Sequence, residues 1–452
     1  MMAIKNGERM RFSKNEVKSI LMVNNNKVYD SFHKKYYSLM CGISQNPDTG
    51  NYIIVSQDEY CEKCSKQYTN IHDKWCLCQN NLTNWSGNKK IDELIQEMHL
   101  KINKSDIIIS IVVEWIPYNQ FINIKETAKD NNNTAIIYLA ILKNGPLLYT
   151  NKEWIRNSYT SVVLKCLDTN EFFSKIKAYS FTGDYNHVLK VYGISQDPNT
   201  KNYIIVLQYA KCGSFNNWMH YFYKNSDCSI KYFLLKYIIE GLKDIHQKQM
   251  VHRDFHIGNI LVNNNDSLKN IPLAICISDM GLCGEVSNKD ETKIYGVMPY
   301  VAPEVLRGKP YTQAADIYSF GMVMYYIITG RQPFDDCAHD EKLALQICSG
   351  IRPEIPEIPE LKSNRYIDLM KKCWDLNPDN RPNVELISSV LDDMGMEILE
   401  DEIKRAEKYL FKEYKENKQL TTTHPQAIYI SRLLNPYTEG LAIDFTELDD
   451  EK

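Results

Sequence analysis

One stretch of eight residues, His252 to Asn259 (HRDFHIGN), constrains this chain more than any other part of its sequence. It follows an amphipathic segment that we expect to be helical, and it precedes a short apolar strand. Asp254 supplies a carboxylate that can accept a proton from a hydroxyl group, and Asn259 supplies an amide oxygen for a metal ion. A second apolar strand ends at Asp279, 25 residues beyond Asp254. Two carboxylates and one amide in this order are what phosphoryl transfer to a hydroxyl group requires.

Three more motifs follow in order: Ala302-Pro303-Glu304, Asp316 in DIYSFG, and Arg381 in NPDNRP. Any one of these motifs occurs often by chance, but their combined order and spacing are specific. Over roughly 280 residues the array resembles the eukaryotic protein kinases. The segments HRDFHIGN, GVMPYVAPEVLRG and KKCWDLNPDNRP are most similar to tyrosine-kinase-like kinases, and to expanded fungal families with an N-terminal cysteine-rich module.

This resemblance implies an α+β fold, the bilobal kinase fold, with a small β-rich N-lobe, a larger helical C-lobe and ATP between them. It implies an enzyme that transfers the γ-phosphoryl group of ATP to a hydroxyl of a protein substrate. Asp254 would be the catalytic base, Lys165 would bind the α- and β-phosphates, and Asn259 and Asp279 would hold Mg²⁺. The residues expected around the adenine are the gatekeeper Leu207, the hinge residues Gln208, Tyr209 and Ala210, and the floor residue Leu261.

Other residues of the array are expected to be structural. Glu304 and Arg381 would form an ion pair that anchors the segment before the substrate-binding helices, and Asp316 would hold the backbone of the catalytic loop. Three hydroxyls between Asp279 and Glu304 are candidate phosphorylation sites near Arg253, with an ordinary exposed hydroxyl as the alternative for each. These are Ser287, Thr292 and Tyr295.

The phosphate-covering loop departs from the kinase pattern. Upstream of Lys165, the corresponding stretch from Lys129 to Tyr138 (KDNNNTAIIY) contains no glycine. Glycine lets backbone amides approach the phosphates closely, so its loss should weaken the grip on ATP, although asparagine adopts some of the same turn conformations. We therefore weigh two functions: an active kinase, and a pseudokinase that acts as a binding or allosteric module.

Two further departures concern the protein substrate. His256 replaces the lysine that serine/threonine kinases usually place two residues after the catalytic aspartate. Val297 replaces the threonine that usually follows the glycine of the substrate-binding loop. A preference for serine and threonine over tyrosine is our expectation.

A lysine stands where the helix after Lys165 usually carries a glutamate. Aligning EFFSKIKAY on similar kinases places Lys175 at that position, and two ammonium groups at about 4 Å repel by about 4 kcal/mol at an effective dielectric of 20. A shift of one helical turn, about 5.4 Å, would allow Glu171 to pair with Lys165 instead. The alternative is a surface pair between Glu171 and Lys175 at i, i+4, contributing about 0.3 to 0.5 kcal/mol.

We divide the chain into four regions. The stretch Gly42 to Gln57 matches Gly193 to Gln208 at 12 of 16 positions, and both copies read as strand, turn, strand. The first copy is either a duplicated N-lobe hairpin or a plain surface hairpin. The regions are an N-terminal segment with this hairpin (1–58), a cysteine-rich module and helix (59–110), the kinase domain (112–392), and a helical then irregular tail (393–452).

Four cysteines cluster ahead of the kinase region: Cys61, Cys64, Cys76 and Cys78. Four thiolates could form a structural Zn²⁺ site. The Cys-x-Cys half chelates less comfortably than Cys-x-x-Cys, and His72 is an alternative ligand. A set of reduced, partly buried cysteines explains the cluster equally well.

Composition excludes several other classes of protein. The formal net charge is −4 and no long Lys/Arg block occurs, so we expect no nucleic-acid partner and no membrane surface. No run of 18 apolar residues and no apolar N-terminal segment are present. Thirteen cysteines, most of them single within apolar runs, indicate reduced thiols and a cytoplasmic protein.

Overall fold

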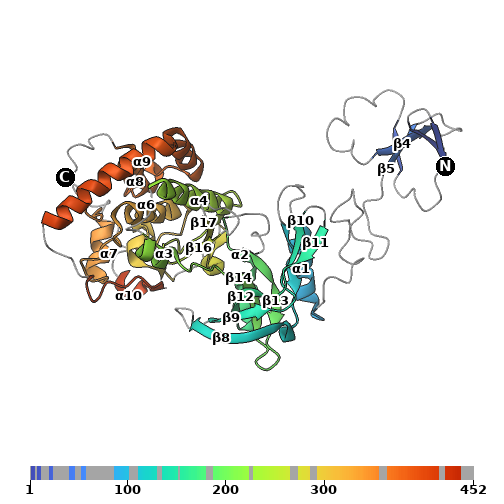
Figure 1. The fold of residues 1–452 in the computed structure, drawn as a ribbon, viewed down its shortest axis with the longest axis horizontal. Helices are drawn as coiled ribbons and strands as arrows, with labels where there is room; N and C mark the ends of the chain where they lie inside the picture. The colour runs from blue at the N-terminus through green and yellow to red at the C-terminus, as the bar shows by residue number, and fades with distance from the viewer. Residues whose placement is uncertain are drawn as a thin grey trace, which may run out of the picture. The chain divides into compact units, whose positions relative to one another are not determined.

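The structure is a computed structural model of the 452-residue chain, drawn in Figure 1. It has two compact units, Met1–Asp106 and Ile107–Lys452, and each is described by itself. The residues that the structure describes are 2–5, 8–11, 20–23, 40–45, 52–56, 86–100, 110–129, 135–150, 153–179, 187–222, 228–264, 273–285, 293–355, 364–416 and 423–438.

The described residues of the first unit form a five-stranded sheet in the order β2-β1-β4-β5-β3 and the helix α1. These elements are β1 (Met2–Lys5), β2 (Glu8–Arg11), β3 (Ile20–Val23), β4 (Met40–Gln45), β5 (Tyr52–Ser56) and α1 (Lys89–Leu100). Ile91, Ile95 and Met98 are buried on α1 at spacings of four and three, as one apolar face of a helix requires. The helix predicted from this pattern is therefore confirmed.

Both copies of the sequence repeat form the same hairpin. In the first copy Gly42 pairs with Val55, and in the second Gly193 pairs with Val206. A β-bulge lies just before the glycine in both copies. At Gly193 a Cβ would lie 2.3 Å from the carbonyl oxygen of Glu114, which explains the glycine there. The two strands are confirmed in both copies and the turn between them in the second copy, whereas the turn of the first copy lies outside the described residues.

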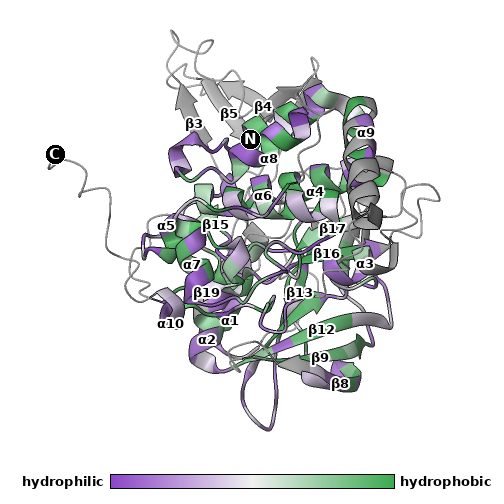
Figure 2. Ribbon diagram, turned by 90° about the vertical axis from the view of Figure 1, so that its left-hand side faces the viewer, coloured by the Kyte–Doolittle hydropathy of each residue, from purple (hydrophilic) through white to green (hydrophobic). Residues whose placement is uncertain are grey.

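The second unit begins with a six-stranded sheet in the order β7-β13-β14-β12-β9-β8. Its hydrophobic face includes Leu142, Val162, Leu164 and Val206, all almost fully buried. Figure 2 shows much of β9 and β12 in the hydrophobic colour. The helix α2 follows β12. The elements are β7 (Glu114–Trp115), β8 (Phe121–Lys129), β9 (Ala135–Leu142), β12 (Thr160–Leu167), α2 (Thr169–Tyr179), β13 (Val191–Gln196) and β14 (Tyr203–Gln208).

A second, three-stranded sheet of this unit was not predicted. It consists of β6 (Ser110–Ile111), β10 (Leu147–Thr150) and β11 (Glu153–Arg156), in the order β11-β10-β6. Arg156 on β11 donates two hydrogen bonds of 2.7 Å to the carboxylate of Glu114 on β7, thereby tying the two sheets together. Burial raises the pKa of Glu114, and the Arg156 guanidinium opposes that rise.

The remainder of the second unit is mainly helical, with α6 at its centre. Every residue of α6 from Ala315 to Thr329 is buried, and α6 contacts α4, α8 and α9 (Figure 1). α6 ends at Gly330, whose φ of 68° provides the left-handed cap. The helices are α3 (Phe215–Phe222), α4 (Cys228–His246), α5 (Pro303–Leu306), α6 (Gln313–Thr329), α7 (Glu341–Cys348), α8 (Arg365–Cys373), α9 (Val384–Glu416) and α10 (Asn435–Thr438).

Short strands join these helices. β15 pairs with β18, β16 with β17, and β19 with β20, each pair antiparallel. They are β15 (Met250–Val251), β16 (Ile260–Asn264), β17 (Leu273–Ile277), β18 (Gly284–Glu285), β19 (Tyr295–Gly296) and β20 (Arg432–Leu433). The helix and strands predicted on either side of HRDFHIGN are confirmed as α4, β16 and β17.

The helix predicted for the tail is the second half of α9. α9 is kinked at Gly395, whose φ of 67° and ψ of 171° are not helical. Leu399 and Ile403, beyond the kink, are fully buried and lie four residues apart, on one face of the helix. The side chains of Ala406 and Leu410, which continue this apolar spacing, lie outside the described residues. Among the helices that the structure describes, none is long and apolar enough to cross a membrane.

Candidate active site

The catalytic loop is fixed to α6 through the carboxylate of Asp316. The backbone N–H groups of His252 and Arg253 donate to it at 2.7 and 3.0 Å, and His246 Nε2 lies 2.9 Å from Oδ2. Arg253 adopts a φ of 70°, a conformation that an L-residue holds only when its surroundings impose it. The predicted role of Asp316 as the anchor of the loop backbone is confirmed.

Asp254 has one carboxylate oxygen engaged and one available. Asn259 Nδ2 donates to the backbone oxygen of Asp254 at 2.9 Å and to its Oδ2 at 3.2 Å. Oδ1 is buried and, among the residues that the structure describes, has no hydrogen-bond partner. A buried carboxylate oxygen without a donor is suited to accept a hydrogen bond from a hydroxyl group brought to it.

Asp279 is brought beside Asn259 by the strand that precedes it. The backbone N–H and the hydroxyl of Ser278 both donate to the carbonyl oxygen of Asn259, at 2.8 and 2.9 Å. His252 Nε2 lies 3.0 Å from the carbonyl oxygen of Ser278 and supports the same junction. Asp279 itself has a φ of 53°, so the chain turns sharply at this point. The backbone therefore places two potential metal ligands side by side.

Lys165 reaches this junction from β12. Its Nζ lies 2.7 Å from Asp279 Oδ1, and its side chain is only 6% exposed, whereas that of Asp279 is 36% exposed. Burial raises the pKa of Asp279, but the nearby charges of Lys165, His252 and Lys175 outweigh this effect and lower the pKa to about 2. Asp279 is therefore a carboxylate at neutral pH, partly open to a cation.

The donor set fits a magnesium ion. Asp279 offers an ionised carboxylate, and Asn259 uses its NH₂ group on Asp254, which leaves its amide oxygen for a metal ion. Mg²⁺ prefers oxygen ligands of this kind together with the phosphates of a nucleotide. In such a site the ion would neutralise charge on the phosphates, and Lys165 is close enough to Asp279 to contact the same phosphates.

The residues expected around the adenine lie at the junction of the two lobes. Leu207 is buried near the end of β14, and the backbone N–H of Gln208 donates to the carbonyl oxygen of Lys190. The chain continues through Tyr209 and Ala210 and turns at Lys211 and Cys212. It then meets β16, where Ser214 pairs with Leu261. The predicted hinge and floor residues therefore belong to adjoining segments.

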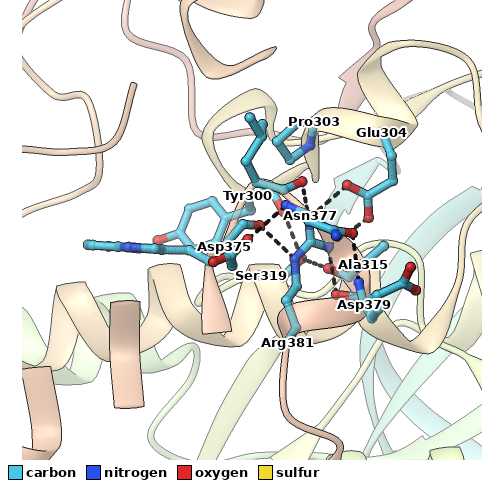
Figure 3. Close-up of polar contacts among 12 residues, drawn as sticks. Tyr300, Pro303, Glu304, Ala315, Ser319, Asp375, Asn377, Asp379 and Arg381 are labelled. Carbon is cyan, nitrogen blue, oxygen red and sulfur yellow. Dashed lines mark hydrogen bonds and ion pairs between the residues drawn. The ribbon is translucent and has the colours of Figure 1, made fainter. Parts of the chain in front are cut away.

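Glu304 and Arg381 form the predicted ion pair, shown in Figure 3. Arg381 Nη1 and Nη2 donate to the two carboxylate oxygens at 2.7 and 2.8 Å, and the Arg381 side chain is completely buried. Arg381 also donates to the carbonyl oxygens of Asp375 and Ala314, both at 2.9 Å. The pair joins α5 to the loop before α9.

His256, which replaces the usual lysine, is directed at the carboxylate of Asp254. Its Nδ1 accepts the backbone N–H of Gly258 at 3.1 Å, so the neutral ring carries its proton on Nε2. That Nε2 lies 3.6 Å from Asp254 Oδ1, just beyond hydrogen-bond length, and both atoms are buried. The sequence identified His256 as unusual but could not show this approach.

On α2, Glu171 pairs with Lys175 at 2.8 Å, as one of the two alternatives predicted. The Lys175 side chain is only 14% exposed, so the pair is less superficial than expected. Lys175 also lies near Lys165 and Asp279, because a Cβ at Gly281 would lie 3.7 Å from Lys175 Cδ, 3.6 Å from Lys165 Nζ and 3.1 Å from Asp279 Oδ1. Two cations thus flank the Asp279 carboxylate.

Several predicted residues lie outside those described. They are the four cysteines of the possible Zn²⁺ site (Cys61, Cys64, Cys76 and Cys78), His72, the loop residues 130–134, Ser287 and Thr292. The strands on either side of the loop, β8 and β9, do form an antiparallel hairpin. Within the described ranges, no cluster of three or more metal-ligating side chains occurs.

Comparison with known proteins agrees with this geometry. The family model described as protein kinase domain matches residues 149–391, more than half of the chain. The chain belongs to the protein kinase domain family. The bilobal α+β fold predicted from the motifs is confirmed, with a β-rich N-lobe and a helical C-lobe. The matched residues begin after β8 and β9, the hairpin whose loop lacks glycine.

Relatives of this kinase domain include serine/threonine kinases from distant organisms. Human receptor-interacting serine/threonine-protein kinase 1 is 28% identical in an alignment of 269 positions, which covers 55% of this chain and 38% of the relative. Serine/threonine-protein kinase STY17 of Arabidopsis thaliana is 27% identical, over 44% of this chain and 34% of its own length. Dual specificity protein kinase shkC of Dictyostelium discoideum is 34% identical, over 34% of this chain and 29% of its own length. The similarity thus spans less than two fifths of each relative.

Proposed function

We propose that this protein is an ATP-dependent protein kinase that phosphorylates serine and threonine residues of protein substrates. The observation that supports this most directly is the state of Asp254. Its Oδ1 is buried without a hydrogen-bond partner among the described residues, while its Oδ2 is fixed by Asn259. A general base has to be held in place and to keep an acceptor oxygen that no other donor occupies, and Asp254 meets both conditions.

The residues of the site divide the work as follows. Asp254 orients the substrate hydroxyl and accepts its proton through Oδ1. Asn259 and Asp279 hold Mg²⁺, whose role is to neutralise charge on the phosphates. Lys165 binds the phosphates from the N-lobe side, and Leu207, the hinge Gln208, Tyr209 and Ala210, and Leu261 enclose the adenine. The serine and threonine kinases among the relatives support the choice of acceptor.

A pseudokinase is the second candidate, and two observations favour it. Lys175 occupies the helix position from which active kinases direct a glutamate at the strand lysine, and here it pairs with Glu171. The phosphate-covering loop also lacks glycine. A pseudokinase of this kind would bind Mg²⁺ and nucleotide through Asp279 and Lys165 without transferring the phosphoryl group.

One pair of variants separates these functions. The full chain is incubated with ATP, Mg²⁺ and a mixture of serine, threonine and tyrosine peptides, and phosphate incorporation is measured beside thermal stability. Asp254→Asn should abolish transfer and keep the stabilisation by Mg²⁺ and ATP, about 2.7 kcal/mol at 100 times Kd. Asp279→Asn should lose both the phosphoryl transfer and the stabilisation by Mg²⁺ and ATP. Stabilisation without transfer in the wild type would identify a pseudokinase, and no stabilisation at all would overturn both functions.

A further inference from the structure

Part of the tail, residues 424–435, contacts the activation segment, by which we mean the stretch between Asp279 and Glu304. β20 pairs antiparallel with β19, so that Leu433 lies opposite Tyr295 and Arg432 opposite Gly296. The contact continues beyond the strands, because Leu434 donates its backbone N–H to the carbonyl oxygen of Ile294 at 2.7 Å. Within the described residues, β19 forms a sheet with β20 alone. The tail thus occupies one edge of the activation segment.

Gly296 on β19 lies beside Asp254, the proposed catalytic base. A Cβ at Gly296, whose φ is 151°, would lie 3.6 Å from Asp254 Oδ1. Paired strands lie about 4.8 Å apart, so the backbone of Arg432 runs one strand away from the residue that adjoins Asp254. A protein substrate has to bring its hydroxyl to the same oxygen. A substrate peptide that paired with β19 to reach this oxygen would need the edge that β20 occupies.

A second set of contacts holds the tail to the segment between α6 and α7. The backbone N–H of His424 donates to the carbonyl oxygen of Asp335 at 2.8 Å. The backbone N–H of Ile428 donates to His339 Nδ1 at 3.0 Å. The side chain of Arg432 donates to the carbonyl oxygen of His339 at 2.6 Å. The tail therefore lies between two separate parts of the C-lobe, and its main chain bonds to both.

Burial distinguishes anchoring residues from exposed ones along the tail. Leu434 is completely buried and Ser431 is 8% exposed, whereas Ile430 is 59% exposed. The side chain of Asn435 adds a further bond, since its Oδ1 accepts the backbone N–H of Ile294 at 2.7 Å. Leu434 and Asn435 thus fix the end of the tail against Ile294, next to β19.

We propose that β19 and the segment Pro333–Asp340 form the docking surface for an extended peptide of the protein substrate, and that residues 424–435 occupy it in cis as a competitor. This rests on the proposed kinase function and adds its regulation. Strand addition to an exposed edge supplies main-chain hydrogen bonds to a peptide of almost any sequence. The tail has taken those bonds, so a substrate binds only in the fraction of molecules whose tail has left.

The test uses full-length protein with Leu434→Ala, which removes the buried anchor but keeps the backbone. Its matched control is Ile430→Ala, an aliphatic residue of the same segment that is exposed. Relative to wild type, Leu434→Ala should raise kcat/KM for a peptide substrate about tenfold, because the competent fraction rises, and should leave KM for ATP unchanged. Ile430→Ala should behave as wild type. The double variant Arg432→Ala with Asn435→Ala removes only polar anchors of the tail. It replaces Leu434→Ala in the test if Leu434→Ala does not fold.

Two measurements report docking without any catalysis. Amide hydrogen exchange at Ile294 should accelerate in Leu434→Ala and stay slow in Ile430→Ala. A fluorescent peptide of residues 423–438 should bind Leu434→Ala and not wild type. If both binding results are obtained but no variant transfers phosphate, the proposed kinase function is wrong and the docking of the tail on this surface is confirmed. If transfer is measurable and both peptide kinetics and exchange are unchanged by the anchor variants, the proposed competition is overturned.

Discussion

Replacing Arg381 by alanine would leave the Glu304 carboxylate buried without its counter-charge. The carboxylate would lose two hydrogen bonds, of 2.7 and 2.8 Å, and the carbonyl oxygens of Asp375 and Ala314 would lose their donor. Breaking a buried ion pair on one side typically costs about 3 to 5 kcal/mol. The complete burial of the Arg381 side chain places the expected loss at the upper end of that range.

Thermal unfolding of the full chain is the assay. A domain of this size changes its Tm by about 2 to 4 °C for each kcal/mol, so Arg381→Ala should lower Tm by roughly 10 °C or more. Arg365→Ala is the matched control, because the Arg365 and Asp393 side chains that form its ion pair are 44% and 73% exposed. An exposed pair contributes at most about 1 kcal/mol. Equal Tm values for the two variants would refute the argument that burial governs the strength of these pairs.

Two further predictions concern single titratable groups. Lys175→Glu should raise the rate of phosphoryl transfer, because it replaces a cation beside Lys165 with an anion that can pair with Lys165. Glu171→Gln should leave that rate nearly unchanged. An unchanged rate in Lys175→Glu would count against any inhibitory effect of Lys175. Burial lowers the pKa of His339 from 6.5, so the unfolded chain binds more protons there. Stability should therefore be complete above about pH 6.5 and fall with pH below it, and His339→Gln should lose less Tm than wild type between pH 7.5 and pH 5.5.

Local sequence patterns predicted most of the fold. The motif order identified the kinase domain, and the apolar spacing predicted α1, α4 and the strands around Asp254. The repeated hairpin was readable because strand pairing follows the alternation of side chains and the turn between them. The pair of Glu304 with Arg381 and the anchoring of the loop by Asp316 followed from the resemblance, since each motif has one partner in that fold.

The features that the sequence did not predict depend on contacts between residues distant in sequence. The sheet of β6, β10 and β11, with its bond from Arg156 to Glu114, was not predicted because its strands are short and carry little periodicity of their own. The helix of the tail was predicted, but the segment after it showed no sign that it would return to the C-lobe. Backbone pairing between β19 and β20 leaves almost no trace in side-chain pattern.

The sequence by itself determined which chemical groups this protein carries and in which order: an ammonium at Lys165, a carboxylate at Asp254, an amide at Asn259 and a carboxylate at Asp279. Only the tertiary structure decided how these groups meet. It pairs Lys165 with Asp279, directs His256 at Asp254, and places the tail beside Gly296. The physical reason is that charge pairing and strand addition act over a few ångströms in space, and the distance along the chain between the partners does not limit them.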